Sequence, residues 1–245
     1  MTLLLYGIVF SRSGGHVSDP PPPGLPPGVG GAAVSLIEEG DLGAAVSRIE
    51  PPDLTRNMTP VLAYAKVVEA LHADRTVLPM RYGCVFEEEP QVVELIRVHG
   101  EEYGAVLRGL DGCVEMGVRV LPPTGSPSRC SPIPPQIRGA SGRAYLAARA
   151  ARYAREEAAD RAVAAVAERL RGALDGLAER IETDRAVRTD RALSSLYFLV
   201  KRGAVEPFRL AFRHIERAEA ARLLLSGPWP PYNFATPPRP GQGHG

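Results

Sequence analysis

The residue types that most often carry chemistry are few and scattered in this sequence. The five histidines stand at positions 16, 72, 99, 214 and 244, and none belongs to an HExxH pair that would hold zinc on one helix face. The three cysteines, Cys84, Cys113 and Cys130, form no CxxC and cannot all pair, which indicates free thiols in a reducing compartment. Nothing supports a Cys84–His dyad, and a small core cysteine is the simpler interpretation.

Patterns for phosphate binding and serine hydrolysis are missing as well. GVGG at residues 28–31 lacks the third glycine of a dinucleotide fingerprint, and the sequence has no GxxxxGK[ST] and no GxSxG. Three glutamates at residues 87–89 precede Pro90, where a solvated helix start favoured by the helix dipole is a simpler interpretation than a cation site. We therefore expect no metal, no cofactor and no enzymatic activity.

One segment invites a nucleic-acid interpretation. RYGCVF at residues 81–86 faintly resembles the aromatic signature of RNA-recognition strands, with LYGI at residues 5–8 as the partner strand. Binding there requires exposed rings for base stacking and basic residues around them. The glycine before the first aromatic residue is missing, and 29 Lys and Arg nearly balance 28 Asp and Glu. We expect no nucleic-acid partner, and the same balance removes the electrostatic argument for an anionic membrane surface.

Length and proline placement predict the domain organisation. The 245 residues suffice for two domains, and no apolar run reaches the roughly 18–20 residues that span a bilayer. The apolar N-terminus lacks a basic leader and a cleavage site, so a buried strand is predicted there instead of a signal peptide. Six prolines fall in each of the patches 20–27, 122–135 and 228–240. We predict domains at 1–122 and 141–234, a Pro/Ser/Gly-rich connection at 123–140 and a flexible tail at 235–245.

Hydrophobic periodicity predicts an α+β fold in both halves. Strands are expected at residues 3–10 (buried on both faces), 32–38, 44–49, 77–80, 114–120 (half-buried), 180–187, 196–200 and 222–225. Helices are expected from Thr59 as N-cap, from Pro90, over 141–177 and over 206–221. The first helix is expected to bury Val61, Ala65, Val68 and Leu71, with Leu62 beside this stripe. The prediction is two largely antiparallel sheets, each with helices on one face in ferredoxin-like variants, the second with a long N-terminal helix.

Several segments, in this order, resemble the gas vesicle F/L family. They are LYGIV at 5–9, VLPMRYGCVF at 77–86, GCVEMGVRV at 112–120, SGRAYL at 141–146, LYFLV at 196–200 and LSGPWPPYNF at 225–234. The second is similar to the family signature V-L-P-x-R-F-G-x-V-F. The resemblance covers residues 3–234, with Tyr64 where many members carry His and Cys84 where a small residue is usual.

The resemblance implies a cytoplasmic, gas vesicle-associated accessory protein that is required for vesicle formation. It also implies contact with the small, very hydrophobic shell protein A and with other accessory proteins, and it leaves F versus L open. A holding role would use an open sheet edge or a groove beside the long helix. The rival is a ligand-binding or enzymatic protein on a ferredoxin-like scaffold, which a deep pocket with converging polar side chains would favour.

The candidate partner-binding residues are Trp229, Tyr232 and Phe234 in the proline-rich segment near the C-terminus. Two interpretations stay open for them. The prolines fix an extended chain that lays the rings over the fold, or the same pre-ordered rings form a binding edge. Two interpretations also stay open for the arginines at 149, 152 and 155, which form either a solvated helix face or a surface for an acidic partner.

Overall fold

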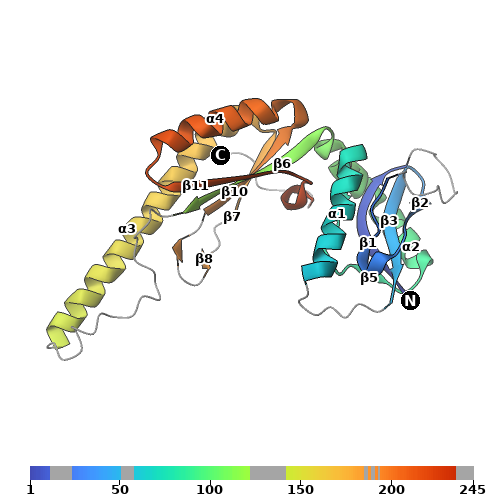
Figure 1. Ribbon diagram of the computed structural model, residues 1–245, viewed down its shortest axis with the longest axis horizontal. Helices are drawn as coiled ribbons and strands as arrows, with labels where there is room; N and C mark the ends of the chain where they lie inside the picture. The colour runs from blue at the N-terminus through green and yellow to red at the C-terminus, as the bar shows by residue number, and fades with distance from the viewer. Residues whose placement is uncertain are drawn as a thin grey trace. The chain divides into compact units, whose positions relative to one another are not determined.

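The chain folds into two compact units. The computed structural model describes residues 1–11, 24–50, 58–121, 142–184, 187–188, 191–192 and 194–235. The first unit contains Met1–Glu115 together with the C-terminal segment from Trp229 onward, and the second contains Met116–Pro228 (Figure 1). The sequence placed residues 229–234 in the second domain instead. The expected connection and nearly all of the expected tail lie outside the described residues, so those boundaries stay a prediction.

The first unit is built on an antiparallel sheet of β1 (Thr2–Phe10), β2 (Val34–Glu39), β3 (Leu42–Ile49), β4 (Val77–Pro79) and β5 (Val85–Phe86). The strand order is β2-β3-β1-β4, with β5 paired to β1. The predicted β2–β3 hairpin is confirmed, and its turn places Gly40 at φ 58°. In β1 the register shifts between Leu5 and Gly7, where a Cβ on Gly7 would meet Val77 Cγ2 at 2.7 Å.

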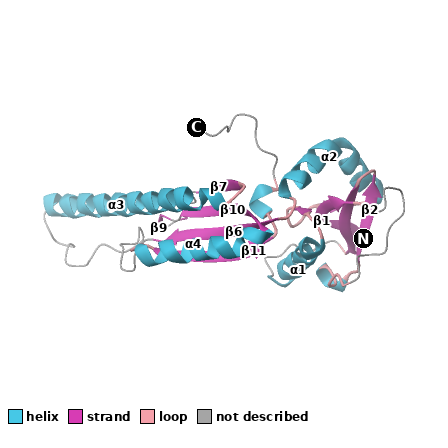
Figure 2. Cartoon of the chain, turned by 90° about the horizontal axis from the view of Figure 1, so that it is seen from above, coloured by secondary structure: helices cyan, strands magenta, loops and turns pink. Residues whose placement is uncertain are grey.

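Helices α1 (Met58–Asp74) and α2 (Glu89–Leu110) cover opposite faces of this sheet (Figure 2). Leu36 of β2 belongs to the core that includes residues of α1, whereas Glu39 of the same strand pairs with Arg97 of α2. Side chains alternate along a strand, so these contacts lie on different faces. The two-sided cover explains why β1 is buried on both faces, as predicted. The sequence had predicted helices on one face only.

Helix α1 buries a different stripe from the predicted one. Val68 and Leu71 are buried as expected, but Val61 is 37% exposed and Leu62 is 55% exposed. The prediction was wrong for these two residues because α1 carries apolar residues on more than one face. Periodicity cannot choose between neighbouring stripes without knowing where the sheet lies.

The second unit contains most of β6 (Cys113–Leu121) and nearly all of β11 (Arg222–Trp229). Its other main elements are α3 (Gly142–Leu174), β7 (Arg180–Asp184), β10 (Ser194–Lys201) and α4 (Val205–Ala218). Short β8 (Val187–Arg188) and β9 (Arg191–Ala192) pair with each other. The strand order is β11-β6-β10-β7, and the main elements follow the sequence β-α-β-β-α-β. The predicted long helix is present at 142–174, although β6 precedes it in this unit.

Helices α3 and α4 pack on this second sheet (Figure 2). The ring of Phe208 in α4 meets that of Phe198 in β10 edge-on, with centroids 5.1 Å apart. Only the C-terminal half of α3 has buried apolar side chains, at Val163, Val166, Leu170 and Leu174 among others. Strand β6 is more buried than the predicted half-buried strand, because Glu115 and Gly117 are buried in addition to the expected Val114, Met116, Val118 and Val120.

Candidate partner-binding surface

The C-terminal segment of the chain is anchored in the first unit. After β11 the chain turns through Pro230 and Pro231 into the short helix η5 (Tyr232–Phe234), where the Phe234 N–H donates to the Pro231 carbonyl at 3.1 Å. The Phe234 side chain is 0% exposed, and the residue belongs to the first unit. In this position its ring cannot meet a partner, which narrows the candidate residues to Trp229 and Tyr232.

Two hydrogen bonds from Asn233 fasten the segment to Glu115. The Asn233 backbone N–H donates to Oε2 at 2.8 Å and its side-chain Nδ2 donates to Oε1 at 2.7 Å. Glu115 is 4% exposed, and this burial raises the pKa of its carboxyl while the two hydrogen bonds act in the opposite direction. The buried carboxylate therefore depends on Asn233 for its hydrogen-bond donors.

Tyr232 and Trp229 remain accessible on this anchored segment. Tyr232 is 39% exposed and Trp229 is 43% exposed. Burial, followed by the negative charges of Glu69 and Glu115, raises the pKa of Tyr232 to about 12. Because Glu69 is a residue of α1, this interaction places the Tyr232 hydroxyl near that helix.

Helix α1 presents an apolar stripe to the outside. Met58 is 64% exposed, Leu62 is 55% exposed and Val61 is 37% exposed, at the i, i+3, i+4 spacing of one helix face. Continuing in steps of three and four, the same face leads to Glu69, beside Tyr232. We call Met58, Val61 and Leu62 the α1 stripe. The sequence had predicted Val61 in the buried stripe and Leu62 beside it, and it had given no prediction for Met58.

The segment VLPMRYGCVF has a structural role around Tyr64. The Tyr64 hydroxyl donates to the Met80 carbonyl at 2.6 Å, and the ring stacks on Tyr6 at 5.0 Å and meets Tyr82 edge-on at 5.3 Å. The Leu5 N–H donates to the Cys84 carbonyl at 2.9 Å. Since Tyr6 is 0% exposed, the two strands do not present the pair of open rings that RNA stacking requires.

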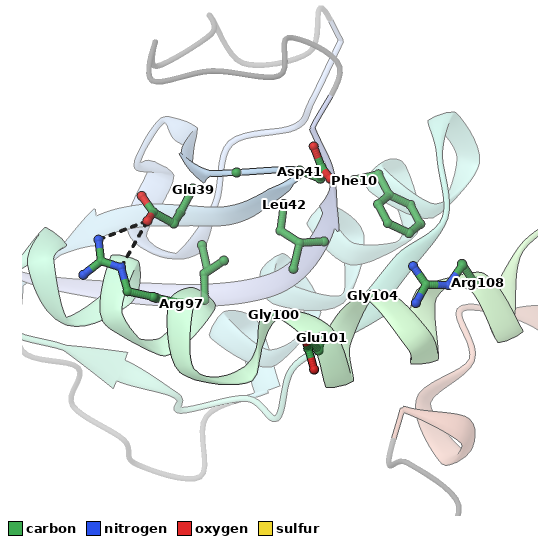
Figure 3. A pocket seen from close by; sticks show the side chains of 11 residues that line it. Phe10, Glu39, Asp41, Leu42, Arg97, Gly100, Glu101, Gly104 and Arg108 are labelled. Carbon is green, nitrogen blue, oxygen red and sulfur yellow. Dashed lines mark hydrogen bonds and ion pairs between the residues drawn. The ribbon is translucent and has the colours of Figure 1, made fainter.

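A hollow of about 740 Å³ lies between α2 and the β2–β3 turn (Figure 3). Leu42 and Ile96 contribute apolar side chains to it, and the Arg97 guanidinium pairs with Glu39 at 3.0 Å and with Glu94 at 3.1 Å. No Ser, Thr, Cys or His is among the described residues that line it. Among the residues that the structure describes, no cluster of three or more His, Cys, Asp or Glu side chains is placed to hold a metal ion.

Comparisons with known proteins agree on one family. The model of the family described as gas vesicle synthesis protein GvpL/GvpF matches residues 2–236. Gas vesicle protein F of Streptomyces sp. (strain CB03234) is 28% identical over 96% of this chain and 99% of its own length. Gas vesicle protein L of the same strain is 30% identical over 85% of each chain. A crystal structure of GvpF from Anabaena sp. PCC7120 superposes with a TM-score of 0.70 at 19% identity, covering 99% of each chain, which shows a shared fold.

Two antiparallel sheets with their helices thus give this chain a mixed α/β fold that the GvpF structure shares. The chain belongs to the gas vesicle synthesis protein GvpL/GvpF family. Its identity to the F and L relatives is similar, so F versus L stays open. In the described part of the chain, no helix is both long enough and apolar enough to cross a membrane.

Proposed function

We propose that this accessory protein binds the hydrophobic shell protein A in the cytoplasm and assists its assembly into the vesicle wall, without making or breaking a covalent bond. The observation that carries the proposal is the α1 stripe. Its three apolar side chains are exposed to solvent, although apolar residues of a helix usually face the core. An exposed apolar stripe on one helix face is the feature by which a protein accepts an amphipathic helix.

Free subunits of a wall that excludes liquid water must carry large apolar faces, and such faces aggregate unless they are covered. Complete burial of Met58 or Leu62 against a subunit contributes about 1–2 kcal/mol each, since both are roughly half exposed beforehand. Tyr232 and Trp229 are proposed to join this surface, because they are partly exposed rigid rings that lose little entropy on docking. We therefore propose α1 as the docking surface; a sheet edge and a groove beside the long helix, which the sequence offered, remain alternatives.

The experiment is co-expression of this chain with shell protein A, followed by co-purification and measurement of the soluble shell protein. Leu62→Ser is expected to reduce both, and Leu210→Ser is the matched control because Leu210 is 62% exposed on α4. Trp229→Ala is expected to weaken capture while the chain remains folded at the assay temperature, which circular dichroism checks. Absence of both co-purification and improved solubility with the unmodified chain would defeat the proposal.

The same experiment separates the helix-binding route from strand addition. Strand β2 is at the edge of the sheet order, so an added strand would pair along it. Ser35→Pro on β2 removes a backbone donor from that strand. Loss of capture in Ser35→Pro with full capture in Leu62→Ser would move the site from the α1 stripe to the sheet edge.

The rival proposal of a ligand-binding or enzymatic protein gains no support from the hollow beside α2. Its Arg97 is paired with carboxylates of the same unit, and no described nucleophile or imidazole faces it. Other accessory proteins remain part of the proposal as partners, and the second unit offers a surface for one of them.

A further inference from the structure

The first half of α3 extends past the sheet that its second half packs on (Figures 1 and 2). No described side chain of residues 142–158 is buried, whereas buried residues recur from Val163 to Leu174. At about 1.5 Å per residue, the extended part is roughly 25 Å long. We call residues 142–158 the α3 arm.

The α3 arm begins with positive charge only. Residues 142–155 contain four arginines, at 143, 149, 152 and 155, and no Asp or Glu, in a chain whose formal net charge is +1. Positive charge is therefore concentrated at one end of one helix. Such concentration favours a partner of opposite charge, because complementary potentials steer association.

The printed contacts of two of these arginines are within the arm itself. The Arg149 Nε and Nη2 atoms donate to the Tyr153 hydroxyl at 3.2 and 3.1 Å, with the guanidinium carbon 5.6 Å from the ring centroid. Arg155 Nε donates to the Ala151 carbonyl at 3.1 Å. No carboxylate of the described residues pairs with Arg149 or Arg155, and a guanidinium has five N–H donors to offer.

Apolar side chains lie between the charges. Leu146 is 64% exposed and Tyr153 is 50% exposed, and a spacing of seven residues places them on one face of the helix. At about 100° per residue, Arg149 lies roughly 50° to one side of this pair and Arg143 roughly 70° to the other. An apolar line bracketed by arginines is the pattern by which a helix selects a partner helix with acidic flanks.

We propose that the α3 arm binds an acidic amphipathic helix of another protein, packing against Leu146 and Tyr153 with its carboxylates on Arg143 and Arg149. This goes beyond the proposed function, because shell protein A is assigned to the first unit and the arm belongs to the second. A helical protein partner is favoured over a nucleic acid because half of the docking face is apolar. An anionic membrane would require the basic residues to share one side, but they surround the helix.

The test is fluorescence anisotropy of a labelled synthetic peptide with leucine heptads flanked by glutamates, titrated with the full chain at low and moderate salt. Arg143→Glu with Arg149→Glu is expected to weaken binding roughly tenfold, since two rim attractions become repulsions. Arg213→Glu with Arg217→Glu is the matched control on exposed positions of α4, and its affinity is expected to stay within about twofold of the unmodified chain. Added salt is expected to weaken peptide binding.

Several results would overturn the proposal. These are absence of peptide binding, equal loss in both double variants, or binding that does not respond to salt. Capture of single-stranded DNA or phosphatidylserine vesicles without the peptide would assign the arm to another ligand. Self-association that disappears in the Arg143/Arg149 variant, without peptide binding, would assign it to a second copy of this chain. Circular dichroism verifies folding, and Arg143→Gln with Arg149→Gln replaces the reversal if that variant does not fold.

Discussion

Replacement of Phe234 by alanine tests whether the C-terminal segment is part of the first unit's core. The ring is fully buried, although it lies only 11 residues before the end of a 245-residue chain. Phe→Ala at a fully buried site costs roughly 3–5 kcal/mol from lost burial and the cavity left behind. That is a large share of the roughly 5–15 kcal/mol that stabilises a domain.

The assay is thermal unfolding followed by circular dichroism, with limited proteolysis of the C-terminus in parallel. For a unit of this size the loss corresponds to a fall of roughly 10–20 °C in Tm. Trp229→Ala is the aromatic comparison; because Trp229 is 43% exposed and leaves no enclosed cavity, its cost is expected to be about 1–3 kcal/mol and below that of Phe234→Ala. A Phe234→Ala variant that melts within about 2 °C of the unmodified protein would show that the ring contributes no core packing, and the reasoning would fail.

Three further predictions concern the same unit. Tyr64→Phe deletes the hydroxyl that donates to the Met80 carbonyl and is expected to cost about 1–3 kcal/mol in urea unfolding; an unchanged midpoint would contradict this role. Burial raises the pKa of Glu115 above its ordinary 4.5, so this carboxyl binds its proton more tightly in the folded protein than in the unfolded chain. The contribution of Glu115 to the free energy of unfolding therefore falls as pH rises from 4.5 through the raised pKa. Glu115→Gln is expected to flatten that slope, and an identical pH profile in the variant would refute it. Gly7→Ala is expected to destabilise by about 1–3 kcal/mol through overpacking, whereas Gly109→Ala in α2, where a Cβ meets nothing within 4 Å, is expected to be neutral or stabilising; equal melting of the two variants would contradict the close approach at Gly7.

The sequence was sufficient for elements whose signal is local. Local patterns predicted three elements correctly: the apolar run of β1, the two-residue turn at Gly40 and the periodic second half of α3. In each case the residues that form the element also carry the pattern that predicts it. The ordered segments also identified the family that the comparisons show. No contact between distant parts of the chain is needed for any of these inferences.

Which residues form the candidate surface depends on tertiary contacts, and no local sequence pattern predicts these contacts. Leu62 and Val68 are equally acceptable core residues on α1, and the position of the sheet alone decides that the first is exposed and the second buried. Phe234 had the sequence context of a binding edge, yet its ring is fully buried.

The sequence by itself thus determined the class of fold, the family and the local elements, because propensity and hydrophobic period act within a few residues. Only the tertiary structure decided which apolar faces remain open and that residues 229–235 return to the first unit. The Asn233–Glu115 hydrogen bonds join residues 118 positions apart. Two residues so distant in sequence meet only when the whole unit folds and buries the Glu115 carboxyl, which then needs hydrogen-bond donors.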